Sequence, residues 1–130
     1  MDPAAAEELK RRTKQFGLRI IRLYRALPRN GEAMVIGRQL LRSGTSVGAN
    51  YRAVCRARSS AEFVSKLGVV IEEADESLYW LEMLLDSGTV TESRLAALLK
   101  ETEELICIFV AARQTARQSL RKSKFKIQNS

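Results

Sequence analysis

Apolar residues recur at helical spacing along four long stretches of this chain, and this periodicity constrains the fold more than any other feature. Steps of three and four residues return to one face of a helix, and one such line is Leu9, Thr13, Phe16, Ile20, Leu23 and Leu27. No stretch alternates in the manner of a strand. The pattern predicts an all-α protein of one domain, with helices at about residues 4–27, 32–56, 60–87 and 91–120.

The links between these stretches are short. Pro28 and Asn30-Gly31 interrupt the first pair, residues 57–60 the second, and Gly88 follows the third helix. Short links join antiparallel neighbours, so we expect an up-down-up-down four-helix bundle. We also expect Asn30-Gly31 to adopt left-handed conformations in a tight reversal.

The last residues, 121–130, form a basic segment that contains Arg121, Lys122, Lys124 and Lys126 beside Phe125 and Ile127. We expect it to be a frayed, solvated tail that follows the last helix. An alternative interpretation is an arm that binds a phosphate backbone, because cations and apolar groups are interleaved along it.

The stretch from Gln39 to Arg56 has three chemically distinct faces when it is read as a helix. The core face carries Ile36, Leu40, Val47, Tyr51 and Val54. The basic face carries Arg38, Arg42, Thr45, Ala49, Arg52 and Arg56, and the polar face carries Gln39, Ser43, Ser46 and Asn50.

Gly44 and Gly48 would each cost about 1 kcal/mol of helix propensity, so we expect a small-residue seam where a neighbouring helix comes close. Contact between these glycines and a ligand is the alternative.

The net charge is +7, and the charged residues are distributed unevenly along the chain. Residues 1–60 carry 13 basic and 4 acidic side chains, residues 61–90 carry 1 and 7, and residues 91–130 carry 8 and 4. The third stretch has an acidic line, Glu72, Asp75, Tyr79, Glu82 and Asp86. This layout indicates either an anionic partner for the basic parts or subunits that dock basic face to acidic face.

Several classes of function find no support in the residues. The chain has no histidine, so di-iron and haem sites lack their usual ligands, and we expect no metal, no cofactor and no enzymatic activity. Cys55 and Cys107 stand alone, and we expect them to be small buried residues in a reducing compartment. The acidic start is unlike a secretory signal and no apolar run is long enough to span a membrane, so we expect a cytoplasmic protein without a membrane partner.

The carboxylates near the middle of the third helix are expected to divide between two sides. Glu72 and Asp75 should face outward, whereas Glu73 and Glu76 lie beside the seam, where Arg42 or Asn50 of the second helix can meet them. Such a network fixes helix register more than it stabilises the fold.

The segment Arg42-Ser43-Gly44-Thr45-Ser46-Val47-Gly48-Ala49-Asn50 resembles the Arg-x-Ser-x-x-Ser-Val/Ile-x-x-Asn signature of a known family. These are the four-helix-bundle proteins encoded by intervening sequences in bacterial 23S ribosomal RNA genes. The third helix is similar to theirs at Glu62-Phe63, Lys66-Leu67, 72–77 and 79–81. One departure is Tyr51-Arg52-Ala53-Val54, where many members have Ile-Ala-Glu-Gly, and it makes the face more basic.

The resemblance implies an antiparallel four-helix protomer and a ring-shaped homopentamer. It also implies kinship with the accessory variability determinant of diversity-generating retroelements, a similar pentamer that binds RNA and a reverse transcriptase. Within this family motif, we expect Ser43, Ser46, Asn50, Glu73 and Glu76 to form a polar network.

Two functions follow from these observations. The first is a non-enzymatic, oligomeric accessory protein that binds nucleic acid, RNA in preference to DNA, through its basic helix faces. The residues expected to contact phosphates are Arg22, Arg25, Arg38, Arg42, Arg52 and Arg56. The second is a protein-interaction scaffold, whose basic and acidic stripes mediate oligomerisation or the docking of a partner such as a reverse transcriptase.

Overall fold

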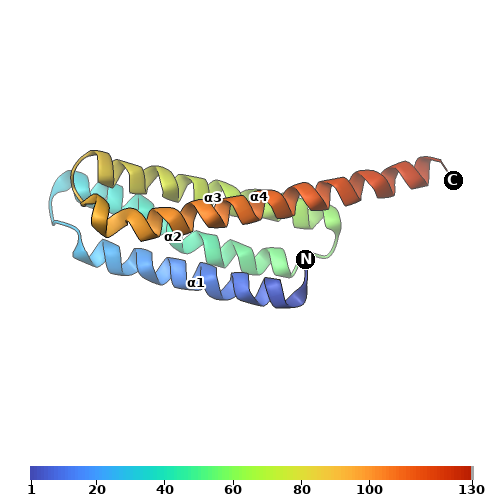
Figure 1. The fold of residues 1–130 in the computed structure, drawn as a ribbon, viewed down its shortest axis with the longest axis horizontal. Coiled ribbons are helices and arrows are strands. Elements are labelled where there is room, and N and C mark those ends of the chain that lie inside the picture. The colour runs from blue at the N-terminus through green and yellow to red at the C-terminus, as the bar shows by residue number, and fades with distance from the viewer. Residues whose placement is uncertain (130) are drawn as a thin grey trace.

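The computed structural model describes residues 1–129, and in that range all regular structure is helical. The helices are α1 (Pro3–Ala26), α2 (Gly31–Cys55), α3 (Ser60–Asp86) and α4 (Glu92–Gln128). Successive helices run in opposite directions, as Figure 1 shows. The prediction of an all-α protein with four helices is therefore confirmed, and every predicted helix end lies within one residue of the observed one except the end of the last helix.

Side-chain caps explain where three of the helices begin. Asp2 accepts a hydrogen bond from the backbone N–H of Ala5 at 3.3 Å, and Ser59 accepts one from Glu62 at 3.1 Å. Asn30 accepts one from Ala33 at 3.0 Å, so this residue is an N-cap and not the left-handed turn residue that we expected. Among residues 1–129 a positive φ occurs at Gly88 alone, which follows α3 as a glycine at C′ should.

The core lies along the seam that the periodicity predicts. Its largest fully buried side chains are Tyr51, Phe16, Phe109, Ile20, Leu40, Leu67, Leu81, Leu84, Leu95, Leu105, Val47 and Val54. All four helices contribute to this list. Burial of each such side chain stabilises the fold by about 1.5–3 kcal/mol before the entropy of ordering is subtracted, so the shared seam is what holds the helices together.

The helices are packed unevenly. Helix α2 lies against α1 and α3, and α3 lies against α4, whereas α1 and α4 touch at few points. One of those points is an ion pair, in which Arg12 donates to Glu101 at 2.5 and 3.2 Å and to Glu104 at 3.1 Å. The pKa of Arg12 is raised because its guanidinium donates hydrogen bonds to Glu101.

Glycines bring α1 and α2 into close contact. A methyl group added at Gly44 would lie 2.8 Å from the side chain of Ile20, and one added at Gly48 would lie 3.2 Å from the backbone oxygen of Thr13. Gly37 is enclosed in the same way by Leu27, at 2.7 Å. These distances agree with the expected small-residue seam, because any side chain at these glycine positions would occupy space that residues of α1 and Leu27 fill.

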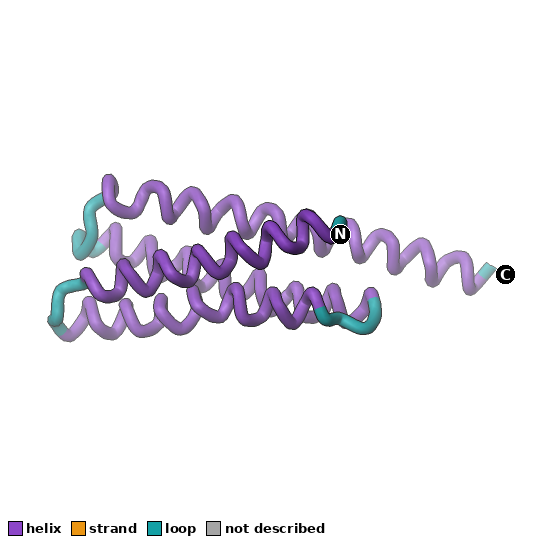
Figure 2. The backbone as a smooth tube through the Cα atoms, turned by 90° about the horizontal axis from the view of Figure 1, so that it is seen from below, coloured by secondary structure: helices purple, strands orange, loops and turns teal. Residues whose placement is uncertain are grey.

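Two expectations about the ends and edges of the bundle were wrong. The segment that begins at Arg121 is not a frayed tail, because α4 continues to Gln128 and extends beyond the other helices (Figures 1 and 2). Ser130, the last residue of the predicted tail, lies outside the described residues. Helix propensity explains the continuation of α4, because the segment contains neither glycine nor proline. Cys55 and Cys107 are exposed and not buried, and neither forms a disulfide.

Candidate functional site

The polar face of α2 meets α3 at two buried serines. The hydroxyls of Ser43 and Ser77 lie 3.0 Å apart, and the Ser77 hydroxyl donates to the backbone oxygen of Glu73 at 2.8 Å. Both serines are buried, and no buried side-chain nitrogen or oxygen among the described residues lacks a partner. A satisfied polar pair inside an apolar seam favours one register of the two helices over its neighbours.

Arg42 extends this contact to the surface. Its guanidinium donates to Glu73 at 3.2 Å and to Glu76 at 2.5 Å, and the indole N–H of Trp80 donates to the same Glu76 carboxylate at 3.3 Å. The hydrogen bond from Arg42 holds the pKa of Glu76 below its ordinary value. The same bond raises the pKa of Arg42.

The other two members of the predicted network bond within α2. Ser46 donates to the backbone oxygen of Arg42 at 2.7 Å, and the Asn50 amide donates to the backbone oxygen of Ser46 at 2.9 Å. Of the alternatives at the α2–α3 seam, Arg42 therefore meets the carboxylates and Asn50 does not. Ser77 was missed as the partner of Ser43, although its position on the apolar seam of α3 is a signal that it faces α2.

Five exposed arginines lie on the adjoining helices α1 and α2 and are here called the basic surface. It comprises Arg22, Arg25, Arg38, Arg52 and Arg56, and none of these five makes an ion pair within residues 1–129. Arg42 was predicted to belong to this set. In the structure Arg42 differs from the other five arginines, because its guanidinium is paired with Glu73 and Glu76 of α3, which neutralise its charge.

A shallow groove lies where α1 and α2 meet. It has a volume of about 250 Å³, its floor includes Gly17, Thr45 and Gly48, and Lys14 and Arg52 lie at its sides. Lys10 also lines it but is paired with Glu7 at 2.9 Å. Small residues on the floor and cations on the sides are suited to an extended anionic chain that lies against the backbone.

The acidic line of α3 is exposed, as predicted, and lies on a different helix from the basic surface. Its members are Glu72, Asp75, Tyr79, Glu82 and Asp86, and its four carboxylates make no ion pair in the described part of the chain. Tyr79 is 51% exposed, and its ring makes an edge contact with Trp80 at 4.9 Å between centroids. The acidic line therefore offers charge and an aromatic side chain to a basic partner.

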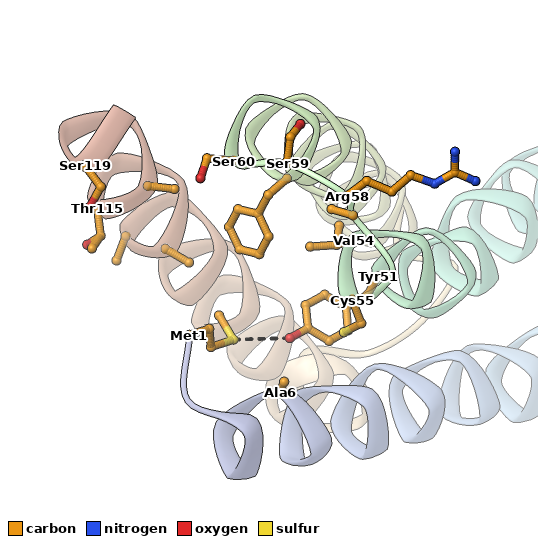
Figure 3. Close-up of a pocket in the computed structure, with 15 residues that line it drawn as sticks. Met1, Ala6, Tyr51, Val54, Cys55, Arg58, Ser59, Ser60, Thr115 and Ser119 are labelled. Carbon is orange, nitrogen blue, oxygen red and sulfur yellow. Dashed lines mark hydrogen bonds between the residues drawn. The ribbon is translucent and has the colours of Figure 1, made fainter. Parts of the chain in front are cut away.

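A cavity lies at the end of the bundle from which α4 extends (Figure 3). It has a volume of about 790 Å³, and its lining includes Tyr51, Phe63, Cys55 and Ala112. Tyr51 donates a hydrogen bond to the sulfur of Met1 at 3.3 Å across it, and burial raises the pKa of Tyr51. The rest of its lining includes the hydroxyls of Ser59, Ser60, Thr115 and Ser119 and the side chain of Arg58.

Two further findings concern metals and membranes. Within residues 1–129 no three carboxylates or thiols come together in a way that would hold a metal ion. None of the described helices has the length and apolar character that a membrane crossing requires.

The fold and the site together define a class: a helical bundle of one domain with a polar α2–α3 seam and oppositely charged faces. The chain belongs to the family of 23S rRNA-intervening sequence proteins, whose model matches residues 7–111. It is similar to a solved structure from Bacteroides thetaiotaomicron, a protein of the S23 ribosomal protein family whose function is unknown. The two share 32% identity with a TM-score of 0.78, over 84% of this chain and 97% of the other. No curated protein sequence matches significantly.

Proposed function

We propose that this protein is a non-enzymatic, cytoplasmic accessory protein that binds nucleic acid, RNA in preference to DNA, through the basic surface of α1 and α2. One observation carries the proposal. Five exposed arginines on adjoining helices have no carboxylate partner within residues 1–129, although the chain has acidic residues enough to pair with them. The choice of RNA rests on the resemblance to the accessory variability determinant of diversity-generating retroelements, which binds RNA.

The energetic argument is counterion release. Each guanidinium that replaces condensed cations on a phosphate backbone makes binding stronger at low salt and weaker at high salt. Arginine also binds phosphate through two parallel N–H donors, which fixes orientation as well as charge. Five such contacts give a slope of log affinity against log salt of about −3.5 on a single strand and about −4.5 on a duplex.

We further propose that the protomers assemble as a ring-shaped homopentamer. At +7 for each chain, five chains would carry +35 and present the basic surface repeatedly to one long ligand. The exposed acidic line of α3 supports a head-to-tail contact, because such a contact joins two different surfaces of the same chain.

The alternative is a scaffold in which the acidic line of one subunit covers the basic surface of the next, or in which either face docks a partner protein such as a reverse transcriptase. The exposed Tyr79 at the centre of the acidic line favours this reading, since tyrosine is enriched at protein interfaces. In that case most of the arginine charge is neutralised by protein and not by nucleic acid.

The test is a fluorescence titration against a structured RNA and a DNA duplex at several salt concentrations, with the mass of the oligomer recorded in each buffer. The variant Arg38→Gln with Arg52→Gln is compared with Arg94→Gln with Lys100→Gln, which removes the same charge from exposed positions of α4. A third variant, Arg42→Gln, tests the paired arginine.

We expect Arg38→Gln with Arg52→Gln to reduce the slope of log affinity against log salt by about 1.4–1.8, with no change in the mass of the oligomer. Arg94→Gln with Lys100→Gln should reduce this slope far less. Arg42→Gln is expected to leave the slope unchanged, because its carboxylates already neutralise it. Equal losses for both pairs would contradict a defined surface. An absence of binding, together with a mass that falls as salt rises, would favour the scaffold.

A further inference from the structure

The final part of α4, residues 117–128, is an arm that extends past the other helices (Figure 1), and Leu120 near its start is its one partly buried residue. The last buried residue of α4 is Phe109, and all of residues 121–129 are exposed. The family model matches up to residue 111, so the arm lies beyond the matched region. It is therefore a feature whose role the family match does not cover.

The arm combines positive charge with an exposed aromatic ring. It carries five basic residues and no acidic one, namely Arg117, Arg121, Lys122, Lys124 and Lys126. Phe125 is 66% exposed, and it shares one shallow depression with Arg121, Lys122 and Lys126. Arg121 and Lys122 stand four and three residues before Phe125, which places their side chains about 5–6 Å from it on one face of the helix.

The apolar residues of the arm do not form the single stripe that a membrane surface or a partner helix requires. Leu120 and Ile127 are seven residues apart and share one side, whereas Phe125 is five residues from Leu120 and lies on another side. Cations lie between them. An amphipathic helix that enters a membrane interface gathers its apolar residues on one face, so the isolated phenylalanine calls for a different partner.

We propose that the arm is a stacking platform for single-stranded nucleic acid, in which one base stacks on the ring of Phe125 and the neighbouring phosphates bind Arg121 and Lys122. This inference rests on the proposed function and adds the strandedness of the ligand. Every base has a flat face that an aromatic ring can stack on, and cations beside the ring track the backbone. In a duplex these faces are already stacked on their neighbours, so Phe125 has no access to them.

The test uses the full chain and fluorescence anisotropy with two probes, an oligouridylate of about 12 nucleotides and a blunt RNA duplex of the same length. Phe125→Ala removes the ring, and Phe125→Leu keeps an apolar side chain without a π face. Ile127→Ala is the control, because it removes an exposed apolar side chain from another side of the same arm. Circular dichroism verifies that the helical content is unchanged.

We expect both Phe125 variants to weaken single-strand binding by about five- to a hundredfold, the effect of losing one stacked base, and to leave duplex affinity as it was. Unchanged single-strand affinity in Phe125→Ala, while Arg38→Gln with Arg52→Gln weakens it, would overturn the platform and leave the proposed function standing. Equal losses on both probes would also overturn it. If the unmodified chain binds neither probe, both the proposed function and the stacking platform that rests on it are refuted. Loss of binding to phosphatidylserine vesicles without any effect on RNA would assign the ring to a membrane instead.

Discussion

Replacing Gly44 by alanine is expected to destabilise the bundle, although alanine is the better helix former. The new methyl group would lie 2.8 and 3.0 Å from the two γ-carbons of Ile20, which is fully buried. Isoleucine is stiff about χ1 and has no free space to move into, so either it leaves its rotamer or α1 shifts. Overpacking of this kind costs about 1–3 kcal/mol, while the change from glycine gains about 1 kcal/mol of helix propensity. The net change is a loss of up to about 2 kcal/mol.

The control is Gly68→Ala in the interior of α3. There the nearest atom to an added methyl group is a guanidinium nitrogen of Arg113 at 3.9 Å, so the substitution keeps the gain in propensity without the clash. The difference between the two variants isolates the packing cost. At about 4 °C per kcal/mol it amounts to roughly 4–12 °C in Tm, measured by circular dichroism at one protein concentration. Equal stabilisation by both alanines would refute the close approach of α1 and α2.

Three further outcomes follow from the side-chain contacts. Glu76→Gln should lower Tm relative to the unmodified chain at pH 7. This difference should vanish as the pH falls below the ordinary glutamate pKa of 4.5. Arg42 lowers the pKa of Glu76 in the folded state, and the resulting stabilisation exists only while the carboxylate is charged. Arg12→Gln should lower the free energy of unfolding by about 1–2 kcal/mol, as it leaves two carboxylates of α4 without their cation; an unchanged value would contradict the pairing. Both Cys55 and Cys107 should react with a thiol reagent in the folded chain, whereas protection of either would show that a partner covers it.

The sequence was sufficient for the fold because every signal in it agreed. Periodicity and short links pointed to the same four helices, and the caps found at Asp2 and Ser59 are of residue types that favour this position. The glycine seam could also be foreseen, since Gly44 and Gly48 inside a long helix require a compensating contact.

Two physical causes explain what the sequence could not give. Whether a residue on a helix is buried or paired depends on the lateral position of the neighbouring helices, and periodicity along one helix does not contain that information. Arg42 lies on the same line as Arg38 and Arg52, yet it is rotated toward α3 and meets two carboxylates there. Cys55 follows the buried Val54 at the end of α2, yet it is exposed and lines the cavity at the end of the bundle. The end of α4 was misplaced because charge was taken as a sign of disorder, although lysine and arginine are good helix formers.

The two proposed uses of the basic surface compete for the same arginines. In a closed head-to-tail ring every protomer contributes both of its contact surfaces, so arginines that a neighbouring acidic line covers are withdrawn from nucleic acid. We expect the arm to stay outside this competition, because residues 117–128 extend past the end of the bundle (Figure 1). An assembly that used the whole basic surface for its own contacts would therefore still present the ring of Phe125 with Arg121 and Lys122 on each arm. This separation makes the arm variants and the surface variants independent probes of the same assembly.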